Sequence, residues 1–228
     1  MKQNLVTGSR VKKTRVKTAK GRIASSTRWL QRQINDPFVL EAKKLGYRAR
    51  SAFKIIELNE QFHLFKPGKK VVDLGAAPGG WTQVIIDLVS SKAENPSVVA
   101  LDILPMEPLP GAKIITMDFM AEDAPKLLKE AAGGPVDAVV SDMAANTTGN
   151  HEVDHLRIMA LVEEAYNFAV EILNEGGAFV AKVFQGGTEQ NLLARIKKDF
   201  KEVKHAKPAA SRKESSEFYI VAKGFRKK

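Results

Sequence analysis

The sequence contains no cysteine, no long apolar run, and no acidic residue before Asp36. Without cysteine, the chain has no disulfide, no thiolate metal site and no cysteine nucleophile. Without an apolar run of about 20 residues, no membrane-spanning segment or signal peptide is predicted. A length of 228 residues fits one α/β domain. We therefore expect a soluble, cytoplasmic protein with a full hydrophobic core.

The net charge of +10 is concentrated at the two ends of the chain. Residues 1–35 hold ten Lys or Arg and no acid, and residues 195–228 hold 12 basic and 4 acidic residues. Residues 71–194 between them hold 6 basic and 18 acidic residues. This distribution favours a positive rim around a differently charged site, and a salt-dependent interaction with phosphates. A basic tail that aids solubility or serves as a localisation signal is the alternative.

Residues 1–24 lack apolar periodicity and are rich in Lys, Arg, Thr and Gly, so a disordered basic arm is predicted there. A single domain is predicted over residues 25–228. Residues 25–27 are expected to cap a first helix that continues through Ile34. Further helices are expected at 36–45, 51–62, 80–90, 122–132, 152–173 and 188–199. Strands are expected at 70–74, 97–102, 113–117, 136–141, 177–184, 202–206 and 217–223. The alternation predicts a mostly parallel seven-stranded sheet covered by helices, and its last two strands form an antiparallel hairpin at the sheet edge.

A glycine-rich turn follows the first expected strand, in the run V-V-D-L-G-A-A-P-G-G-W at 71–81. Glycine permits positive φ and close approach of a ligand to the backbone, so a strand, such a turn and a helix N-terminus form a cofactor cradle. The order of the glycines does not match G-x-G-x-x-G, and no Gly-Lys-Ser/Thr follows. The turn therefore suits an adenosine-bearing ligand without phosphates, such as S-adenosylmethionine. A tight turn that binds nothing is the alternative.

Acidic residues stand at the ends of several expected strands, where ligands of open α/β sheets bind. Asp102 is placed to accept the ribose hydroxyls, Asp118 to meet the adenine edge, and Asp142 to lie near the methyl-bearing end. A single aspartate of this kind is often only a cap, and Asp73 is open to a structural interpretation. His151 and His155 lack a third ligand nearby, so no metal site is expected.

Lys182 lies inside the apolar strand F-V-A-K-V-F. Burial disfavours the charged form of lysine, and a neutral lysine can act as a general base. An edge-strand lysine that reaches out to water is the alternative. Glu217 begins a later strand and could orient an ammonium group, whereas Lys54 is indistinguishable by itself from a surface helix residue.

Five motifs in one order resemble the FtsJ/RrmJ (RlmE) family of ribosomal RNA large-subunit methyltransferases over residues 25–224. They are R-A-R-S-A-F-K, D-L-G-A-A-P-G-G-W, S-D-M-A, V-A-K-V-F-Q-G and S-R-x-x-S-x-E-x-Y-I-V-A. The resemblance implies a Rossmann-like methyltransferase fold. It also implies S-adenosylmethionine-dependent methylation of the ribose 2′-hydroxyl of a uridine in 23S-type ribosomal RNA, at the assembled-subunit stage, with S-adenosylhomocysteine as the product.

The resemblance further implies a catalytic tetrad, in which Lys182 is the proton acceptor, of Lys54, Asp142, Lys182 and Glu217. It implies cofactor contacts at Gly79, Trp81, Asp102, Asp118 and Asp142, and no metal. The large ribosomal subunit is the expected partner of a monomer that needs no membrane and no protein partner. Two features depart from the family: Ala145 replaces a proline before Asn146, and the basic arm is longer.

Two roles for Lys182 stay open at this point, because Lys54 would favour its neutral form and the two carboxylates its charged form. A neutral Lys182 would take the hydroxyl proton, and a charged one would steady the developing alkoxide. Phosphates are expected to meet a positive rim that includes Arg28, Arg48, Arg50 and Arg212.

Two other functions remain as alternatives. A base methyltransferase would favour Asp/Asn-Pro-Pro-aromatic at Asp142 or a cysteine for carbon-5 chemistry, and the chain has neither. An RNA-binding assembly factor without chemistry would not need the four tetrad residues.

Overall fold

The structure is a computed structural model that describes residues 14–15, 24–145, 149, 151–184, 190–212 and 214–227. Among these residues, no helix is long and apolar enough to cross a membrane. The expected disordered arm falls almost wholly outside the described residues and remains a prediction. Three of its residues are described: Thr14, Arg15 and Ala24, which is already helical. The backbone N–H of Thr14 donates to Asn35 Oδ1 at 2.7 Å.

One seven-stranded sheet forms the centre of the molecule, in the order β3-β2-β1-β4-β5-β7-β6. Its strands are β1 (Val71–Leu74), β2 (Val98–Asp102), β3 (Ala112–Thr116), β4 (Val136–Ser141), β5 (Leu173–Phe184), β6 (Phe200–Ala206) and β7 (Glu217–Phe225). The first five strands run parallel, and β7 is antiparallel to both β5 and β6. The predicted sheet and its antiparallel C-terminal hairpin are confirmed, and β6 is the edge strand.

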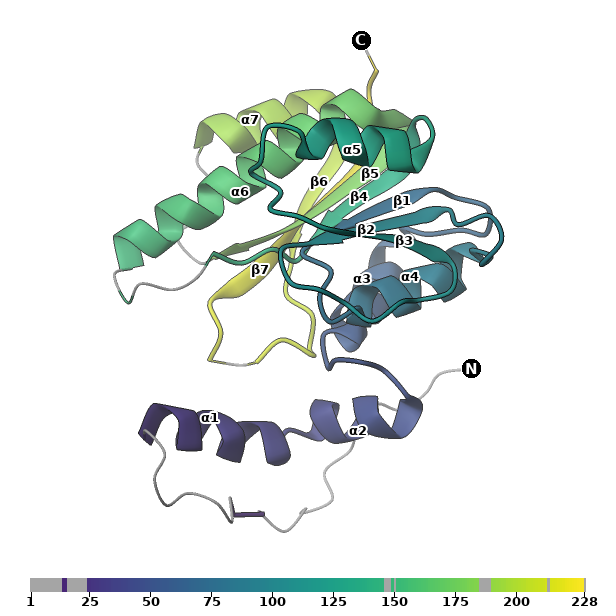
Figure 1. Cartoon of the computed structure of the whole chain (residues 1–228). Helices are drawn as coiled ribbons and strands as arrows, with labels where there is room; N and C mark the ends of the chain where they lie inside the picture. The colour runs from purple at the N-terminus through teal and green to yellow at the C-terminus, as the bar shows by residue number, and fades with distance from the viewer. Residues whose placement is uncertain are drawn as a thin grey trace.

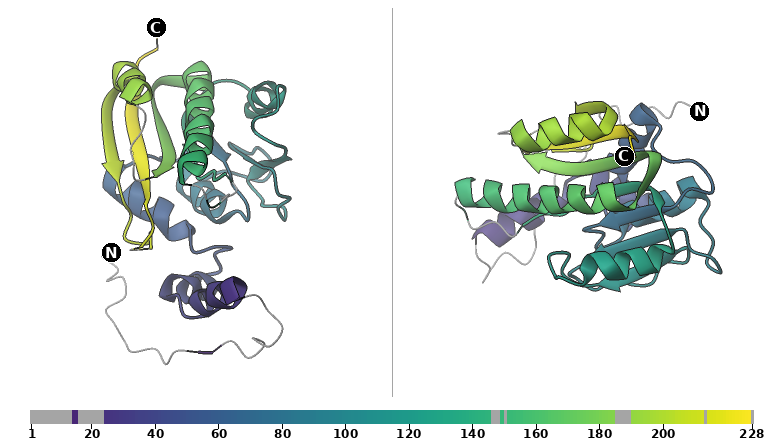
Figure 2. Two further views of the ribbon diagram at one scale, coloured as in Figure 1. Left: turned by 90° about the vertical axis from the view of Figure 1, so that its left-hand side faces the viewer. Right: turned by 90° about the horizontal axis from the view of Figure 1, so that it is seen from above.

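Helices cover both faces of this sheet (Figures 1 and 2). On one face lie α5 (Ala124–Ala132), α6 (His151–Ile172) and α7 (Gln190–Asp199), and on the other α3 (Ala52–Phe62) and α4 (Gly80–Val89). Side chains alternate along a strand. In β1, Val72 and Leu74 pack towards α5 and α6, and Val71 packs towards α3 and α4. Each face therefore has its own apolar core.

Two further helices, α1 (Ala24–Ile34) and α2 (Pro37–Leu45), lie beyond one end of the sheet (Figure 1). Asp36 caps α2 by accepting the Phe38 N–H at 3.0 Å, and Pro37 occupies its first turn. Gly46 ends it with a φ of 78°. The expected cap of α1 at residues 25–27 is wrong, because the helix already begins at Ala24 and these residues form its first turn.

The observed boundaries otherwise differ from the predicted ones by a few residues. The largest difference is in β5, which begins at Leu173 because this residue pairs with Val136 before an irregularity in the register. Residues 188–189, the expected start of α7, lie outside the described part of the chain.

Candidate active site

The glycine turn between β1 and α4 lets the backbone segment after β4 come close. Gly75 has a φ of 76°, and a Cβ there would lie 2.7 Å from the backbone N and Cα of Met143. Gly79 has a φ of 104°, and a Cβ there would lie 3.0 Å from Leu109 and 3.2 Å from Arg48. Any side chain at Gly75 would therefore push the Met143 segment away from the end of β1.

The strand-end acids Asp102 and Asp118 hold turns and also line a cavity. Asp102 accepts the Ala77 N–H through Oδ2 and the Leu104 N–H through Oδ1, both at 2.8 Å. Asp118 Oδ1 accepts the Met120 N–H at 2.9 Å. The capping interpretation and the binding interpretation therefore both apply, because a carboxylate oxygen has more than one lone pair.

A cavity of about 410 Å³, here called the strand-end pocket, opens at the carboxyl ends of the strands. Its lining combines two carboxylates with apolar side chains and includes Gly75, Asp102, Ile103, Asp118, Met120 and Met143. Ile103 and Met120 are exposed at its edge, 63% and 50% respectively. The sequence analysis missed both of them, although each directly follows or nearly follows a predicted strand-end aspartate. Apolar walls with two acceptors fit a nucleoside, whose base is flat and whose ribose carries two hydroxyls.

The other three residues expected to bind the cofactor, Gly79, Trp81 and Asp142, do not line this pocket. Trp81 is buried, its Nε1–H donates to the Ser51 carbonyl at 2.9 Å, and its ring centroid lies 5.6 Å from that of Tyr219. The Trp81 side chain thus joins α4 to α3 and β7. Gly79 and Trp81 flank the N-terminus of α4, so only their backbone is available to a ligand.

Asp73 lies fully buried beneath the glycine turn. Its Oδ2 accepts the Thr82 hydroxyl at 2.7 Å, and its Oδ1 has no hydrogen-bond partner among the described residues. Burial raises the pKa of Asp73 to about 7, and the carboxylates of Asp142 and Asp102 add to this effect, while the Thr82 hydrogen bond opposes it. Asp73 supports the turn from below.

The four residues of the expected tetrad lie in one chain of contacts. Lys182 Nζ lies 3.1 Å from Asp142 Oδ1 and donates to the Asp142 carbonyl at 2.7 Å. Lys54 Nζ lies 3.1 Å from Glu217 Oε2. Lys182 and Lys54 are only 6% and 9% exposed. The interpretation of Lys182 as a lysine that reaches out to water is therefore wrong, and Lys54, which its sequence context could not distinguish from a surface residue, is buried.

Tyr219, which the sequence analysis did not single out, connects the two halves of this chain. Its hydroxyl accepts from Lys54 Nζ at 3.0 Å and donates to Asp142 Oδ1 at 2.8 Å. Burial raises the pKa of Tyr219 well above its ordinary value, and the Asp142 and Glu217 carboxylates raise it further. The hydroxyl therefore keeps its proton and remains a donor to Asp142. Its position two residues after Glu217 was the available signal, because residues i and i+2 of a strand share a face.

The topology of the sheet explains why these residues meet. Asp142 follows β4 directly, and Lys182 lies near the carboxyl end of β5, where it pairs with Tyr219 of β7. Because β7 runs antiparallel to β5, its first residues, including Glu217, lie at the same edge of the sheet. Lys54 reaches this edge from the first turn of α3.

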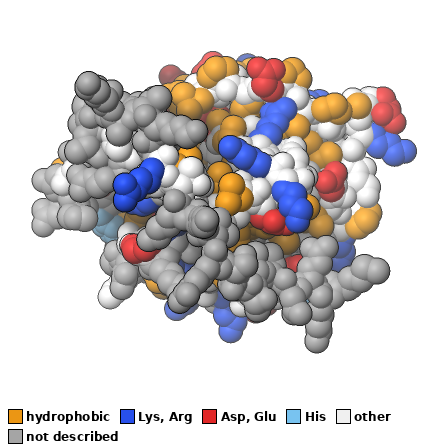
Figure 3. Space-filling model, turned by 90° about the horizontal axis from the view of Figure 1, so that it is seen from below, with side chains coloured by type: hydrophobic (Ala, Val, Ile, Leu, Met, Phe, Trp, Pro, Cys, Tyr) orange, Lys and Arg blue, Asp and Glu red, His pale blue; other side chains and the backbone are white. Residues whose placement is uncertain are grey.

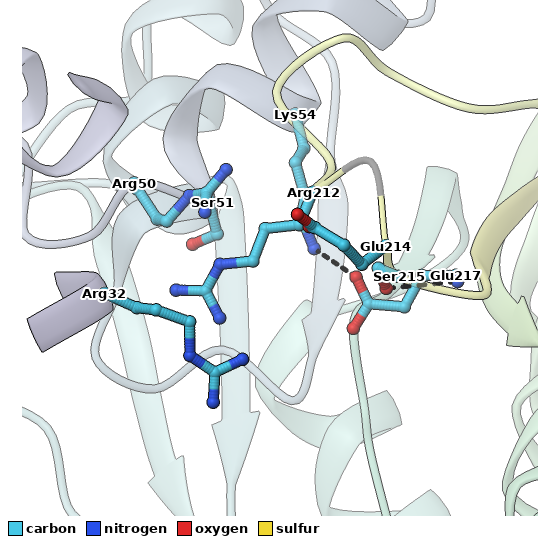
Figure 4. A pocket seen from close by; sticks show the side chains of 8 residues that line it. All are labelled: Arg32, Arg50, Ser51, Lys54, Arg212, Glu214, Ser215 and Glu217. Carbon is cyan, nitrogen blue, oxygen red and sulfur yellow. Dashed lines mark hydrogen bonds and ion pairs between the residues drawn. The ribbon is translucent and has the colours of Figure 1, made fainter. Parts of the chain in front are cut away.

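A second cavity, of about 340 Å³ and here called the basic pocket, is lined in part by residues of the tetrad (Figure 4). Lys54 and Glu217 belong to its wall. The complete lining is Arg32, Arg50, Ser51, Lys54, Arg212, Glu214, Ser215 and Glu217. Since Met143, next to Asp142, lines the strand-end pocket, the chain Lys54–Tyr219–Asp142 runs from one pocket to the other.

The arginines of the expected positive rim differ in their surroundings. Arg50 forms an ion pair with Asp36 and donates to the Ala210 carbonyl. Burial lowers the pKa of Arg50, while Asp36 opposes this effect and Arg212 adds to it. Arg212 lies 3.6 Å from Asp36. The side chain of Arg28 lies outside the described residues.

Arg48 has a different surrounding, because backbone carbonyls occupy its guanidinium group. Nη1 donates to the carbonyls of Glu107 at 2.7 Å and Pro78 at 3.3 Å, and Nη2 donates to that of Pro108 at 2.9 Å. The Arg48 backbone N–H also donates to Gln83 Oε1 at 2.7 Å. Arg48 thus holds the glycine turn against the loop between β2 and β3.

The face of the molecule seen from below the sheet carries Lys and Arg side chains beside exposed apolar ones (Figure 3). No group of three or more His, Asp or Glu side chains that could hold a metal ion occurs in the described ranges. The side chain of His151 lies outside these ranges.

Comparison with known proteins adds to this geometry. Residues 47–225 match the FtsJ-like methyltransferase family. The chain is 61% identical over 221 residues to ribosomal RNA large subunit methyltransferase E of Paramagnetospirillum magneticum, covering 96% of this chain and 91% of that protein. It is 60% identical over 221 residues to the protein of the same name from Rhodospirillum rubrum, covering 96% and 84%.

A crystal structure described as that of a ribosomal RNA methyltransferase from Plasmodium falciparum has a similar fold. Its TM-score is 0.67 at 29% identity, and the match covers 78% of this chain and 98% of that one. The matched family segment includes the glycine turn, the strand-end acids Asp102 and Asp118 and all four residues of the tetrad. The chain belongs to the FtsJ-like methyltransferase family.

Proposed function

We propose that the protein methylates the ribose 2′-hydroxyl of a uridine in large-subunit ribosomal RNA, with S-adenosylmethionine as the methyl donor. The observation that carries this proposal is the position of the tetrad between two unlike pockets. The strand-end pocket has the apolar walls and carboxylates that suit a nucleoside, and the basic pocket has the cations that suit a phosphate backbone. The names of the relatives at 60–61% identity support ribosomal RNA as the methyl acceptor.

The residues of the strand-end pocket fit the cofactor. Asp102 would accept the ribose hydroxyls, Asp118 would meet the adenine edge, and Ile103 and Met120 would cover the base. The backbone at Gly79 and Trp81 and the Asp142 segment would face the amino-acid part. When bound, S-adenosylmethionine supplies an electrophilic methyl group.

Lys182 is the residue that we assign to the proton of the 2′-hydroxyl. A ribose hydroxyl is a weak nucleophile at neutral pH, so it needs a base as its oxygen attacks. Asp142 fixes the position of Lys182 Nζ through two contacts, and Lys54 is held in turn by Glu217 and Tyr219. In its charged form, Lys182 would instead stabilise the alkoxide. A rate that rises with pH through one ionisation indicates the base, and a rate that falls indicates the charged form.

We further propose that the substrate is the assembled large subunit, and that the protein acts in the cytoplasm as a monomer. Two features of the chain bear on the substrate. The basic pocket is lined by four basic side chains, and one of them, Arg32 of α1, is exposed. A structured RNA loop can reach such a site without threading.

The test is transfer of a labelled methyl group from S-adenosylmethionine to purified large subunits, to free large-subunit RNA and to small subunits. We expect label in large subunits, at one uridine whose 3′ linkage becomes resistant to alkaline hydrolysis, since a methylated 2′-oxygen cannot attack the phosphate. Label on a base, or label in small subunits alone, would contradict the proposal. Label in free RNA but not in subunits would contradict only the assembled-subunit stage.

A further inference from the structure

The four basic side chains of the basic pocket differ in how many of their donors are already used. Lys54 is held by Glu217 and Tyr219, and Arg50 by Asp36 and the Ala210 carbonyl. Arg212 has one longer contact, 3.6 Å from Asp36. Asp36 is therefore shared between two arginines, and Arg50 holds it more closely.

The side chain of Arg32, on α1, makes no hydrogen bond or ion pair with the residues that the structure describes, and it is exposed. Arg32 comes from α1 and Arg212 from the loop between β6 and β7, and both side chains line the basic pocket (Figure 4). Two guanidinium groups that share a space repel each other unless an anion lies with them. Their planar forks match the oxygens of a phosphate group.

Two arginines of the expected rim, Arg48 and Arg50, have fewer N–H groups available to a ligand. Arg48 is engaged by three backbone carbonyls, and it spans the glycine turn and the loop between β2 and β3. The side chain of Arg50 is only 15% exposed. Both residues hold elements in place. Their charge strengthens the local field, while several of their N–H groups are bound within the protein and Arg50 Nε is buried without a hydrogen-bond partner among the described residues.

We propose that Arg32 and Arg212 together bind one phosphodiester group of the RNA strand next to the target ribose, and that Arg48 and Arg50 do not contact the strand. This assignment rests on the proposed function. It follows from location as well as charge, because Lys54 and Glu217 form part of the wall of the same pocket. It also gives α1 a role in substrate binding, and it differs from the expectation that Arg48 and Arg50 belong to the phosphate-binding rim.

The test compares the salt dependence of RNA binding among variants, measured without cofactor on a single-stranded fragment of large-subunit RNA. Each phosphate contact adds about 0.7 to the slope of log affinity against log salt concentration for single strands. Arg32→Gln and Arg212→Gln should each lower the slope by about 0.7 or less, and the double variant should lower it by less than the sum of the two. The shared phosphate is the reason for the non-additivity.

Arg48→Gln is the matched control, since it removes the same charge from the same side of the molecule. It should leave the slope unchanged and weaken the binding of S-adenosylhomocysteine several-fold, because the glycine turn loses its clamp. Arg48→Lys, which keeps the charge but not the fork, should weaken that binding too. Arg32 and Arg212 variants that keep the wild-type slope, or an Arg48→Gln variant that lowers it, would overturn the assignment.

Failure of this assignment can be told apart from failure of the proposed function. Unchanged slopes together with normal 2′-O-methylation by the wild type would reject only the phosphate site. Absence of ribose methylation by the wild type would reject the function, on which the site depends.

Discussion

At the scale of single residues, the side chain that organises the candidate active site is Tyr219. Its hydroxyl is the link between Lys54 and Asp142, and through Asp142 it is connected to Lys182. Lys54 and Tyr219 are 165 residues apart in the sequence, so no local pattern could have revealed their contact. Two lysines are held in fixed positions because one neutral hydroxyl can both accept and donate.

Replacing Tyr219 with phenylalanine tests this role. The Tyr219→Phe variant keeps the buried ring but loses both hydrogen bonds, so we expect the maximal methyl-transfer rate to fall about 10- to 100-fold. This range corresponds to about 1.5–3 kcal/mol for a hydrogen bond to a charged group. Tyr47→Phe is the control, because Tyr47 contacts Phe53 only through its ring. Steady-state kinetics with unchanged KM for RNA would support positioning, whereas a wild-type rate for Tyr219→Phe would refute it.

The buried carboxyl of Asp73 predicts a pH dependence of stability. The pKa of Asp73 rises from an ordinary 3.8 to about 7 on folding, so the folded state binds the proton more tightly. Between about pH 4 and pH 7 the unfolded chain releases this proton while the folded chain retains it, and Asp73 therefore lowers stability as the pH rises.

The Asp73→Asn variant has no such proton. Its free energy of unfolding, relative to that of the wild type, should increase by up to about 4 kcal/mol from pH 4 to pH 7 and stay level above pH 7. Urea denaturation at a series of pH values measures this difference. Parallel curves for the two proteins would show that Asp73 is ionised in the folded state throughout.

At the scale of elements, the loop between β6 and β7 is attached to the rest of the site on two sides of Ala210. The backbone N–H of Ala210 donates to both carboxylate oxygens of Glu57 on α3, at 3.1 and 3.2 Å, and Ala210 is fully buried. Arg50 holds the Ala210 carbonyl from the other side. This loop carries Arg212, so its attachment to α3 fixes one side of the basic pocket.

Removal of the Glu57 carboxylate should loosen that loop. In Glu57→Ala we expect the amide protons of residues 209–212 to exchange about tenfold faster, since a lost hydrogen bond to a charged acceptor is worth about 1.5 kcal/mol or more. Glu57→Gln, which keeps one acceptor, should show a smaller effect. Hydrogen exchange measures both, and equal protection in Glu57→Ala and the wild type would contradict the anchoring role.

The elements themselves were predictable to a large extent, and their cross-connections were not. Apolar periodicity and the strand-end aspartates Asp102 and Asp118 are local signals. They predicted every strand and two of the residues that line the strand-end pocket. Arg48, Glu57 and Tyr219 bind partners that are distant in sequence, and polar residues of this kind look like ordinary surface residues until the chain is folded. The family resemblance, rather than any periodicity, drew Lys54 into the tetrad.

At the scale of the whole molecule, the contacts from Lys54 through Tyr219 to Asp142 connect two pockets with different linings. The parallel strands end at the strand-end pocket. The antiparallel strand β7 brings Glu217 and Tyr219 to the same edge of the sheet. Basic residues of α1, of α3 and of the loop between β6 and β7 line the basic pocket. From the acidic middle of the sequence, Asp102 and Asp118 line the strand-end pocket, whereas Arg32 and Arg212 from its basic ends line the basic pocket.

The central claim is that Lys182 takes the proton of the 2′-hydroxyl in the proposed ribose methylation. The direct measurement is the single-turnover rate of labelled methyl transfer to large subunits by the wild type, Lys182→Met and the control Lys204→Met on the exposed edge strand β6. We predict a loss of about 10²- to 10⁴-fold for Lys182→Met, with RNA and cofactor affinities kept within a few-fold, and no change for Lys204→Met. Equal rates for Lys182→Met and the wild type would contradict the claim.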